Sequence, residues 1–237
     1  MKDLIIALDF PNGKKTMEFL DKFTNEKPFV KIGMELFYAE GTPFLKKIKE
    51  YGHKIFLDLK LHDIPNTVKS AMRVLADLEI DMVNVHSAGG VMMMKAALEG
   101  LTSSQSTRPL LIAVTQLTST SQEMLRNELL IQQPINDTIV HYAKNVKEAG
   151  LDGVVCSPLE TRIIKQACGG DFLIITPGIR LKSSAKDDQV RITTPTQAGK
   201  NGSDFIVIGR PITQAENPAE TYRKCLQEFL FSSKIQE

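Results

Sequence analysis

An acid and a base lie two positions apart at the end of an apolar segment of the chain. Asp58 and Lys60 would project from the same face of an extended strand, because side chains alternate between the two faces. Burial of such a pair costs desolvation energy, so further charged partners are needed, and Lys31 and Asp63 are candidates. The pattern predicts an alternating array of two acids and two bases. Such an array is either a salt-bridge network that fills space or the charged centre of an active site.

A second group of residues indicates an anion site. Gly209 follows the apolar run Phe205–Ile208, and Arg210 comes next at the start of an expected helix. Backbone N–H groups, a helix N-terminus and a guanidinium together favour anion binding. Arg180 follows the preceding apolar run, at a position where many barrels bind phosphate. The alternative is that Arg210 is a surface residue and Gly209 only a turn. The coincidence of this site with Asp9 and the charged array favours an active site for a small phosphorylated molecule.

Eight short apolar runs rich in β-branched residues must position these side chains. Each run is nearly continuous rather than alternating, which is typical of parallel strands covered by helices on both faces. Segments with helical spacing separate the runs, so the order is strand and helix in repetition. The runs are Leu4–Leu8, Phe29–Ile32, Lys54–Leu59, Met82–Val85, Leu110–Val114, Gly153–Cys156, Phe172–Ile175 and Phe205–Ile208.

Two α/β architectures compete for this pattern. Eight units of about 30 residues each fit a closed (β/α)8 barrel. An open doubly wound sheet that binds a dinucleotide would show GxGxxG after its first strand, whereas residues 9–13 read DFPNG. We therefore predict a single-domain (β/α)8 TIM barrel over residues 1–237. The long connections after Val114 and Ile175 would lie at its carboxyl-end face, where long loops usually act as lids.

Composition excludes several classes of protein. The 237 residues carry a formal net charge of +1, which disfavours a dedicated nucleic-acid binder. The three cysteines are odd in number and far apart, so neither a disulfide framework nor a zinc site is expected. The first apolar run, of five residues, is too short for a signal-peptide core or a membrane span. We expect a cytoplasmic protein with no nucleic-acid or membrane partner.

Taken in order along the chain, the motifs resemble those of the orotidine 5′-phosphate decarboxylase family. The central signature is Asp58-x-Lys60-x-x-Asp63-Ile64-Pro65-Asn66-Thr67. Because the resemblance covers essentially the whole chain, it is far more specific than Asp-x-Lys-x-x-Asp alone, which related barrels share. The other matching stretches are residues 9–11, 30–33, 86–90, 115–119, 176–180 and 208–211.

The resemblance implies a reaction and a role for the charged array. The reaction is a cofactor-free and metal-free loss of CO₂ from the pyrimidine C6 of orotidine 5′-monophosphate, which gives UMP. Lys60 would donate the proton to C6, and Asp58 would lie against the departing carboxylate. Lys31 would hold the charge array and a ribose hydroxyl.

The resemblance also implies a homodimer and the remaining substrate contacts. Asp63 and Thr67 would reach into the site of a partner subunit, and Ile64 between them is included among the substrate-binding residues. The other contacts would be Asp9 at the ribose, Thr118 at the pyrimidine end, and Arg180, Gln189, Gly209 and Arg210 at the phosphate.

Two alternatives remain open at this level. A related barrel decarboxylase or aldolase would act on a sugar phosphate through a bound metal, but such enzymes carry an acidic ligand where this chain has Lys31. A phosphate-binding barrel without catalytic activity is the second alternative. Intact Asp58, Lys60 and Asp63 argue against it.

Overall fold

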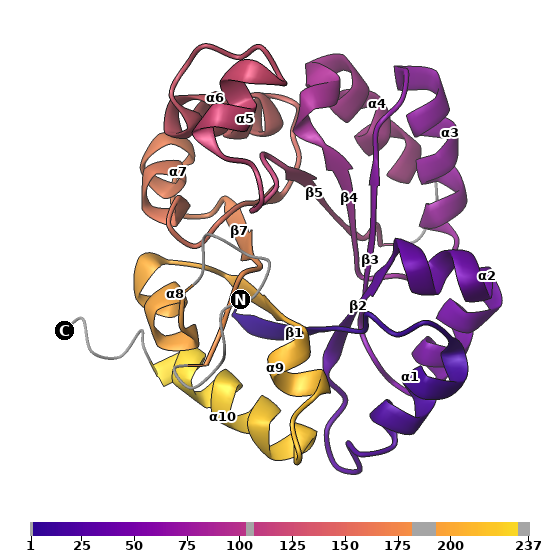
Figure 1. Cartoon of the computed structure of the whole chain (residues 1–237). Coiled ribbons are helices and arrows are strands. Elements are labelled where there is room, and N and C mark those ends of the chain that lie inside the picture. The colour runs from indigo at the N-terminus through magenta and orange to yellow at the C-terminus, as the bar shows by residue number, and fades with distance from the viewer. Residues whose placement is uncertain (1, 103–106, 182–192, 232–237) are drawn as a thin grey trace.

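The computed structural model describes residues 2–102, 107–181 and 193–231. Eight parallel strands close into a barrel in which each strand pairs with the next in sequence and the last pairs with the first. Helices surround the barrel (Figure 1), so the predicted (β/α)8 architecture is confirmed. The strands are β1 (Asp3–Ala7), β2 (Phe29–Gly33), β3 (Ile55–Leu61), β4 (Met82–His86), β5 (Leu110–Val114), β6 (Gly153–Val155), β7 (Leu173–Thr176) and β8 (Phe205–Ile208).

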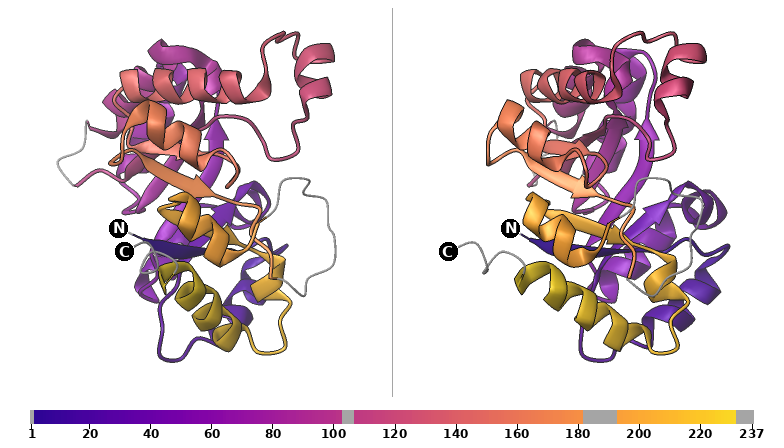
Figure 2. Two further views of the ribbon diagram at one scale, coloured as in Figure 1. Left: turned by 90° about the vertical axis from the view of Figure 1, so that its left-hand side faces the viewer. Right: turned by 60° about the vertical axis from the view of Figure 1, so that its left-hand side comes forward.

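The helices differ in regularity. α2 contains Gly41 with φ 68° and ψ −167°, two residues before Pro43, so it consists of two helical pieces joined at a kink. The long connection after β5 holds the short α5, which stands out from the ring of helices (Figure 2). The helical segments are α1 (Gly13–Leu20), α2 (Met34–Glu50), α3 (Pro65–Ala76), the 3₁₀ turn η1 (Ser87–Gly89), α4 (Gly90–Leu101), α5 (Gln122–Asn127), α6 (Ile135–Glu148), α7 (Thr161–Cys168), α8 (Pro195–Asn201), α9 (Arg210–Thr213) and α10 (Pro218–Phe231).

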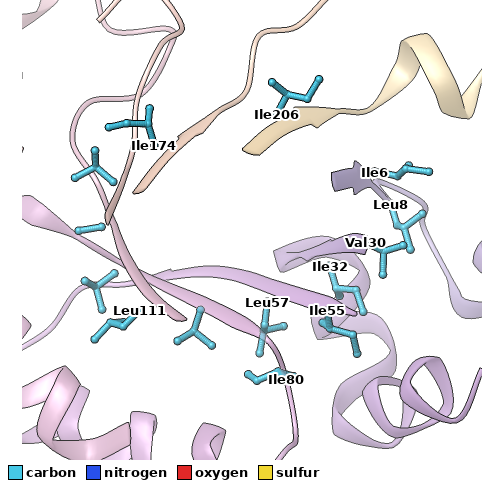
Figure 3. Packing of buried hydrophobic residues seen from close by; sticks show 14 of the residues in the cluster. Ile6, Leu8, Val30, Ile32, Ile55, Leu57, Ile80, Leu111, Ile174 and Ile206 are labelled. Atoms are coloured by element: carbon cyan, nitrogen blue, oxygen red, sulfur yellow. The ribbon is translucent and has the colours of Figure 1, made fainter. Parts of the chain in front are cut away.

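Alternate strand residues form two apolar layers. Ile5 and Ala7 belong to a cluster inside the barrel, where the rings of Phe29 and Phe205 meet edge to face with centroids 6.1 Å apart. Ile6 belongs to the larger cluster between the barrel and its helices, part of which Figure 3 shows. Full burial of one such large apolar side chain contributes about 1.5–3 kcal/mol. Because the interior is filled, the open space for a site lies at the strand ends.

Aspartates join neighbouring strands at the N-terminal end of the barrel. Asp152, just before β6, donates its N–H to the carbonyl of Leu111 at 2.9 Å and accepts the Leu111 N–H on Oδ2 at 2.7 Å. Its carbonyl accepts the N–H of Leu173 at 3.0 Å. Arg108 binds the two carboxylate oxygens at 2.6 and 2.8 Å, which is the strong bidentate form of ion pair. One residue thus connects β5, β6 and β7.

The same arrangement recurs before β4 and before β8. Asp81 and Asp204 each exchange two hydrogen bonds with one residue of the preceding strand, pair with a lysine, and accept an N–H from the next strand. We call these three aspartates and their partners the rim clamps. The partners are Ile55, Lys49 and Leu110 for Asp81, and Ile174, Lys165 and Asp3 for Asp204.

Candidate active site

The carboxyl ends of the strands surround a cavity of about 300 Å³. It is lined by the charged side chains of Lys31, Asp58 and Lys60 and by apolar side chains from β3, β5, β6 and β8. Residues 116–119 after β5, which include the predicted Thr118, and Pro177 after β7 also line it. This is the end of a (β/α)8 barrel at which active sites form.

Four charged side chains form a continuous chain beside this cavity. Lys31 Nζ lies 3.0 Å from Asp9 Oδ1 and 3.4 Å from Asp58 Oδ2. Lys60 Nζ lies 2.7 Å from Asp58 Oδ1. The alternation of acids and bases is as predicted from the sequence. Its outer acid within one chain is Asp9 rather than Asp63, because Asp9 follows β1, the neighbour of the strand that carries Lys31.

The charges in this array support one another. Burial by itself would lower the pKa of Lys31, but the carboxylates of Asp58 and Asp9 outweigh burial and raise that pKa. Burial would likewise raise the pKa of Asp58, but the ammonium groups of Lys31 and Lys60 hold it below its ordinary value. Lys31 and Asp58 are therefore both ionised at neutral pH, although their side chains are only 12% and 11% exposed.

Lys60 extends from an irregular stretch of β3. Leu57 pairs with Val83 and Leu61 pairs with Val85, so three residues of β3 lie opposite a single residue of β4. Lys60 itself has φ 54°, in the left-handed region that costs a non-glycine residue about 1–2 kcal/mol. The backbone of β3 is therefore irregular at Lys60, but the expected division of faces is kept: Asp58 and Lys60 both line the cavity, whereas Leu59 and Leu61 pack against the helix-side cluster.

The residue of β4 opposite this bulge is Asn84, which the motifs of the sequence do not include. It is buried, and its Nδ2 donates to Asp58 Oδ1 at 2.7 Å while its Oδ1 accepts the backbone N–H of Lys60 at 2.8 Å. The signal in the sequence was an amide within the apolar run Met82–Val85. A buried amide needs hydrogen-bond partners, and here both partners belong to the charged array.

The second half of the signature lies outside the cavity. Asp63, Ile64 and Thr67 are exposed in the loop after β3 and at the start of α3, and Ile64 is 67% exposed. Asp63 Oδ1 accepts the N–H of Ile64 at 2.6 Å. The structure therefore separates these residues from Asp58 and Lys60 of the same chain.

The predicted phosphate residues follow adjacent strands. Gly209 and Arg210 follow β8, and Arg180 follows β7. A Cβ added to Gly209 would stand 3.7 Å from Asp9 Oδ2, so its backbone lies beside the charged array. Gln189 lies outside the described residues.

The described residues contain neither a candidate metal centre nor a candidate membrane span. No group of three or more His, Cys, Asp or Glu side chains within residues 2–102, 107–181 and 193–231 is arranged to hold a metal ion. Within the same ranges, no helix has the length and apolar character needed to cross a membrane.

Comparison with known proteins gives a consistent result. A family model described as "Orotidine 5′-phosphate decarboxylase / HUMPS family" matches residues 2–225. A protein of Bacillus cytotoxicus named orotidine 5′-phosphate decarboxylase is 57% identical over 231 residues, which cover 96% of this chain and 97% of the relative. A protein of the same name from Bacillus mycoides is 56% identical with the same coverage.

Solved structures agree with the sequence relatives. The crystal structure of orotidine 5′-phosphate decarboxylase from Lactobacillus acidophilus superposes with a TM-score of 0.87 at 42% identity, covering 97% of this chain and 99% of that one. A crystal structure described as an uncharacterized conserved protein from Geobacillus kaustophilus gives a TM-score of 0.86 at 49% identity, covering 95% and 99%. The likeness therefore extends over nearly the entire barrel.

Proposed function

We propose how the charged cavity works in this chain, which belongs to the orotidine 5′-phosphate decarboxylase / HUMPS family. Its reaction is the decarboxylation of orotidine 5′-monophosphate to UMP and CO₂, a step of pyrimidine biosynthesis. The observation that carries the mechanism is Lys60 Nζ, held 2.7 Å from Asp58 at the edge of the cavity.

Lys60 is the proton donor in this mechanism. When the bond between C6 and the carboxylate breaks, CO₂ leaves and the electron pair of that bond stays on C6. This pair then takes a proton from Lys60 Nζ and forms the new C6–H bond, which leaves Lys60 as a neutral amine. At about 4 Å and an effective dielectric constant near 20, one ammonium stabilises this charge by roughly 4 kcal/mol, which corresponds to about a thousandfold in rate. The array that holds Lys60 in place supplies a preorganised positive charge where negative charge develops.

Asp58 lies against the departing carboxylate and orients the two lysines. Its two oxygens face different ammonium groups, Lys60 and Lys31, so its position fixes both. Within this array Lys31 also reaches a ribose hydroxyl, and Asp9 binds the ribose. The geometry that supports this assignment is the 3.0 Å contact between Asp9 and Lys31.

The phosphate and the pyrimidine supply binding energy at opposite ends of the substrate. Arg180, Gln189, Gly209 and Arg210 bind the phosphate, and Thr118 helps to close the pyrimidine end. Binding energy from groups remote from the reacting carbon can hold the site closed and so lower the barrier. The position of Arg180 and Arg210 after adjacent strands supports this role.

The decarboxylation requires neither a cofactor nor a metal. We expect the purified protein to convert orotidine 5′-monophosphate at an unchanged rate in the presence of EDTA, because Lys60 supplies the positive charge that a metal would otherwise supply. The loss of the orotate chromophore measures the rate. A rate that EDTA abolishes and a divalent cation restores would instead favour the metal-dependent alternative.

A homodimer completes the site. Exposed apolar side chains stand at the starts of three consecutive helices: Met34 and Tyr38 on α2, Ile64 before α3 and Met92 on α4. Apolar surface gathered in this way marks protein interfaces. A second copy of the chain covers it, and Asp63 and Thr67, which lie in the same region, contact the partner's substrate.

Shared sites make a specific prediction for mixed dimers. If Lys60 of one subunit works with Asp63 of the other, a hybrid of the Lys60→Ala and Asp63→Asn chains contains one intact site. After full exchange of subunits, about a quarter of the wild-type activity should return, because half of the dimers are hybrids with one working site each. Sedimentation and the turnover assay measure exchange and activity.

The matched control mixes two variants altered on the same side of the site, Lys60→Ala and Asp58→Asn. That mixture should remain inactive. Failure of the first mixture to regain activity after verified exchange would contradict the shared site.

We also assign the enzyme to the cytoplasm. Cys156, Cys168 and Cys225 are free and buried. Buried free thiols support a reducing compartment.

A further inference from the structure

Asn84 connects the side chain of one member of the array to the backbone of another. The N–H of Lys60 can only donate a hydrogen bond, and the Asp58 carboxylate, lying between two ammonium groups, can only accept. A single orientation of the Asn84 amide satisfies both, with Nδ2 on Asp58 and Oδ1 on Lys60. The chemistry of its partners therefore fixes the orientation of this amide.

The amide takes the place of a strand hydrogen bond. At the bulge, residues 58–60 lie opposite Asn84 alone, so the regular ladder does not provide a backbone partner for each residue of β3. The Asn84 side chain accepts the Lys60 N–H at 2.8 Å, at the residue with φ 54°. This bond stabilises the left-handed conformation from which the Lys60 side chain starts.

The same amide also fixes the Asp58 carboxylate. Asp58 Oδ1 accepts from Asn84 Nδ2 at 2.7 Å and faces Lys60 Nζ at 2.7 Å, which leaves Oδ2 to face Lys31 at 3.4 Å. A carboxylate without the Asn84 bond could turn about its terminal torsion, which is broad for aspartate. Asn84 thus constrains the plane of the Asp58 carboxylate, and the carboxylate in turn holds both lysines.

We propose that Asn84 is a positioning residue of the decarboxylation, which holds Lys60 Nζ and the Asp58 carboxylate in register with C6 of the substrate. The proposal rests on the proposed function, because it presumes that Lys60 is the proton donor. Asn84 acts through these two residues and does not itself line the cavity. The role is in geometry and charge, so it should change turnover more than binding.

The first test is Asn84→Ala. We expect kcat to fall about 100-fold, the loss that follows a displacement of about 1 Å in a catalytic group. The KM for orotidine 5′-monophosphate and the Kd for UMP should stay within about threefold, because the phosphate contacts are distant. Calorimetric UMP binding also verifies that the variant is folded. A kcat within threefold of the wild type would overturn the proposal.

The second test, Asn84→Asp, separates positioning from mere filling of space. The introduced carboxyl group takes the place of the amide beside Asp58. A proton shared between the two carboxylates therefore replaces the hydrogen bond that Asn84 Nδ2 donates in the wild type. The remaining oxygen can accept the Lys60 N–H. We expect kcat of this variant to rise as the pH falls from 8 to about 5, where carboxyl groups that face one another bind a proton.

The Asn84→Ala variant should show the opposite trend. The amide hydrogen bond is one of the contacts that keep the pKa of Asp58 low, so its loss moves the acidic limb of the kcat profile to higher pH. The charged and titratable groups around Asp58 are Lys31 from β2, Lys60 from β3, Asp9 after β1, His86 at the end of β4, and His62, which directly follows β3 and contacts the His86 ring. All of them are the same in both variants, so they cannot produce opposite trends. Parallel profiles in the two variants would overturn the proposal.

Ser203→Ala provides a matched control. Ser203 is also buried and bonded, through its Oγ, to Thr176 Oγ1 at 3.0 Å, but it has no contact with the array. Its kcat and pH profile should equal those of the wild type. Turnover of the wild-type enzyme in the same assay distinguishes the proposed function from the positioning role. If the wild type shows no turnover, the proposed function is refuted. If the wild type is active and the Asn84 variants equal it, only the positioning role is refuted.

Discussion

Replacement of Lys60 with alanine is expected to reduce kcat by about 10⁵-fold or more. Roughly 10³ of this comes from the lost ammonium charge, and a further factor of about 10²–10⁴ comes from the lost proton donor. The Kd for UMP should stay within about tenfold, because the proposed phosphate-binding residues Arg180, Gly209 and Arg210 follow other strands. Turnover by loss of the orotate chromophore and UMP binding by calorimetry measure the two quantities.

The control for this experiment is Lys224→Ala. Lys224 is an exposed lysine on α10, so its removal changes the net charge by the same amount without touching the cavity. Its kcat should equal that of the wild type. If Lys60→Ala keeps substantial decarboxylation activity, Lys60 is not the proton donor.

Removal of the Asp58 charge should affect both turnover and stability. Asp58→Asn leaves the ammonium groups of Lys31 and Lys60 without the carboxylate between them. Loss of one partner of a buried ion pair destabilises a protein by about 3–5 kcal/mol. Because the cavity brings solvent to this ion pair, we expect the loss of stability in Asp58→Asn to be near the lower end of that range. We expect kcat to fall by at least about 10³-fold, since the lysine positions depend on this charge.

The dependence of stability on pH has a definite sign in the wild type. The pKa of Asp58 is lower in the folded protein than its ordinary value of 3.8, so its contribution is present above that pH and is lost only as the pH falls through the folded-state pKa. The pKa of Lys31 is raised above 10.5, so its contribution is present below that pH and is lost as the pH rises through the folded-state pKa. Between these limits, the array contributes a constant stability.

In Asp58→Asn the alkaline limit should move to lower pH. Burial lowers the pKa of Lys31, and with Asp58 gone only Asp9 opposes that effect. Urea unfolding at a series of pH values measures the change, with Asp77→Asn on the surface beyond α3 as a control that should stay within about 0.5 kcal/mol of the wild type. An unchanged alkaline limit would show that Asp58 does not sustain the charge of Lys31.

The sequence predicted the strands well because their pattern depends on simple burial. Strands covered on both faces must be apolar throughout, and all eight predicted runs coincide with strands, with ends displaced by at most two residues. Charged residues placed at the ends of such runs face one mouth, so the meeting of Lys31, Asp58 and Lys60 also followed from the barrel. The kink in α2 was less visible, because the helical spacing continues beyond Gly41 and Pro43.

The details of the site depend on pairing across strands, which sequence alone does not specify. Asn84 acts because β3 and β4 change register opposite it, and nothing in the spacing of either strand states that register. The left-handed conformation of Lys60 follows from the same bulge. Asp63 is exposed in the loop after β3, where its carboxylate accepts the N–H of Ile64, and it does not line the cavity. The signature is contiguous in sequence, but its two halves lie in different places.

The rim clamps indicate which segments of related barrels can be exchanged by recombination. Each clamp closes a segment that runs from its cation through an even-numbered strand, namely residues 49–86, 108–155 and 165–208. Such a segment contains its own aspartate, the cation that pairs with it, and both hydrogen bonds between the aspartate and the preceding strand. From its new neighbour it needs only one N–H at the start of the following strand. These three segments are therefore self-contained units of the barrel. Recombination between relatives at the boundaries of these segments would leave every rim clamp intact.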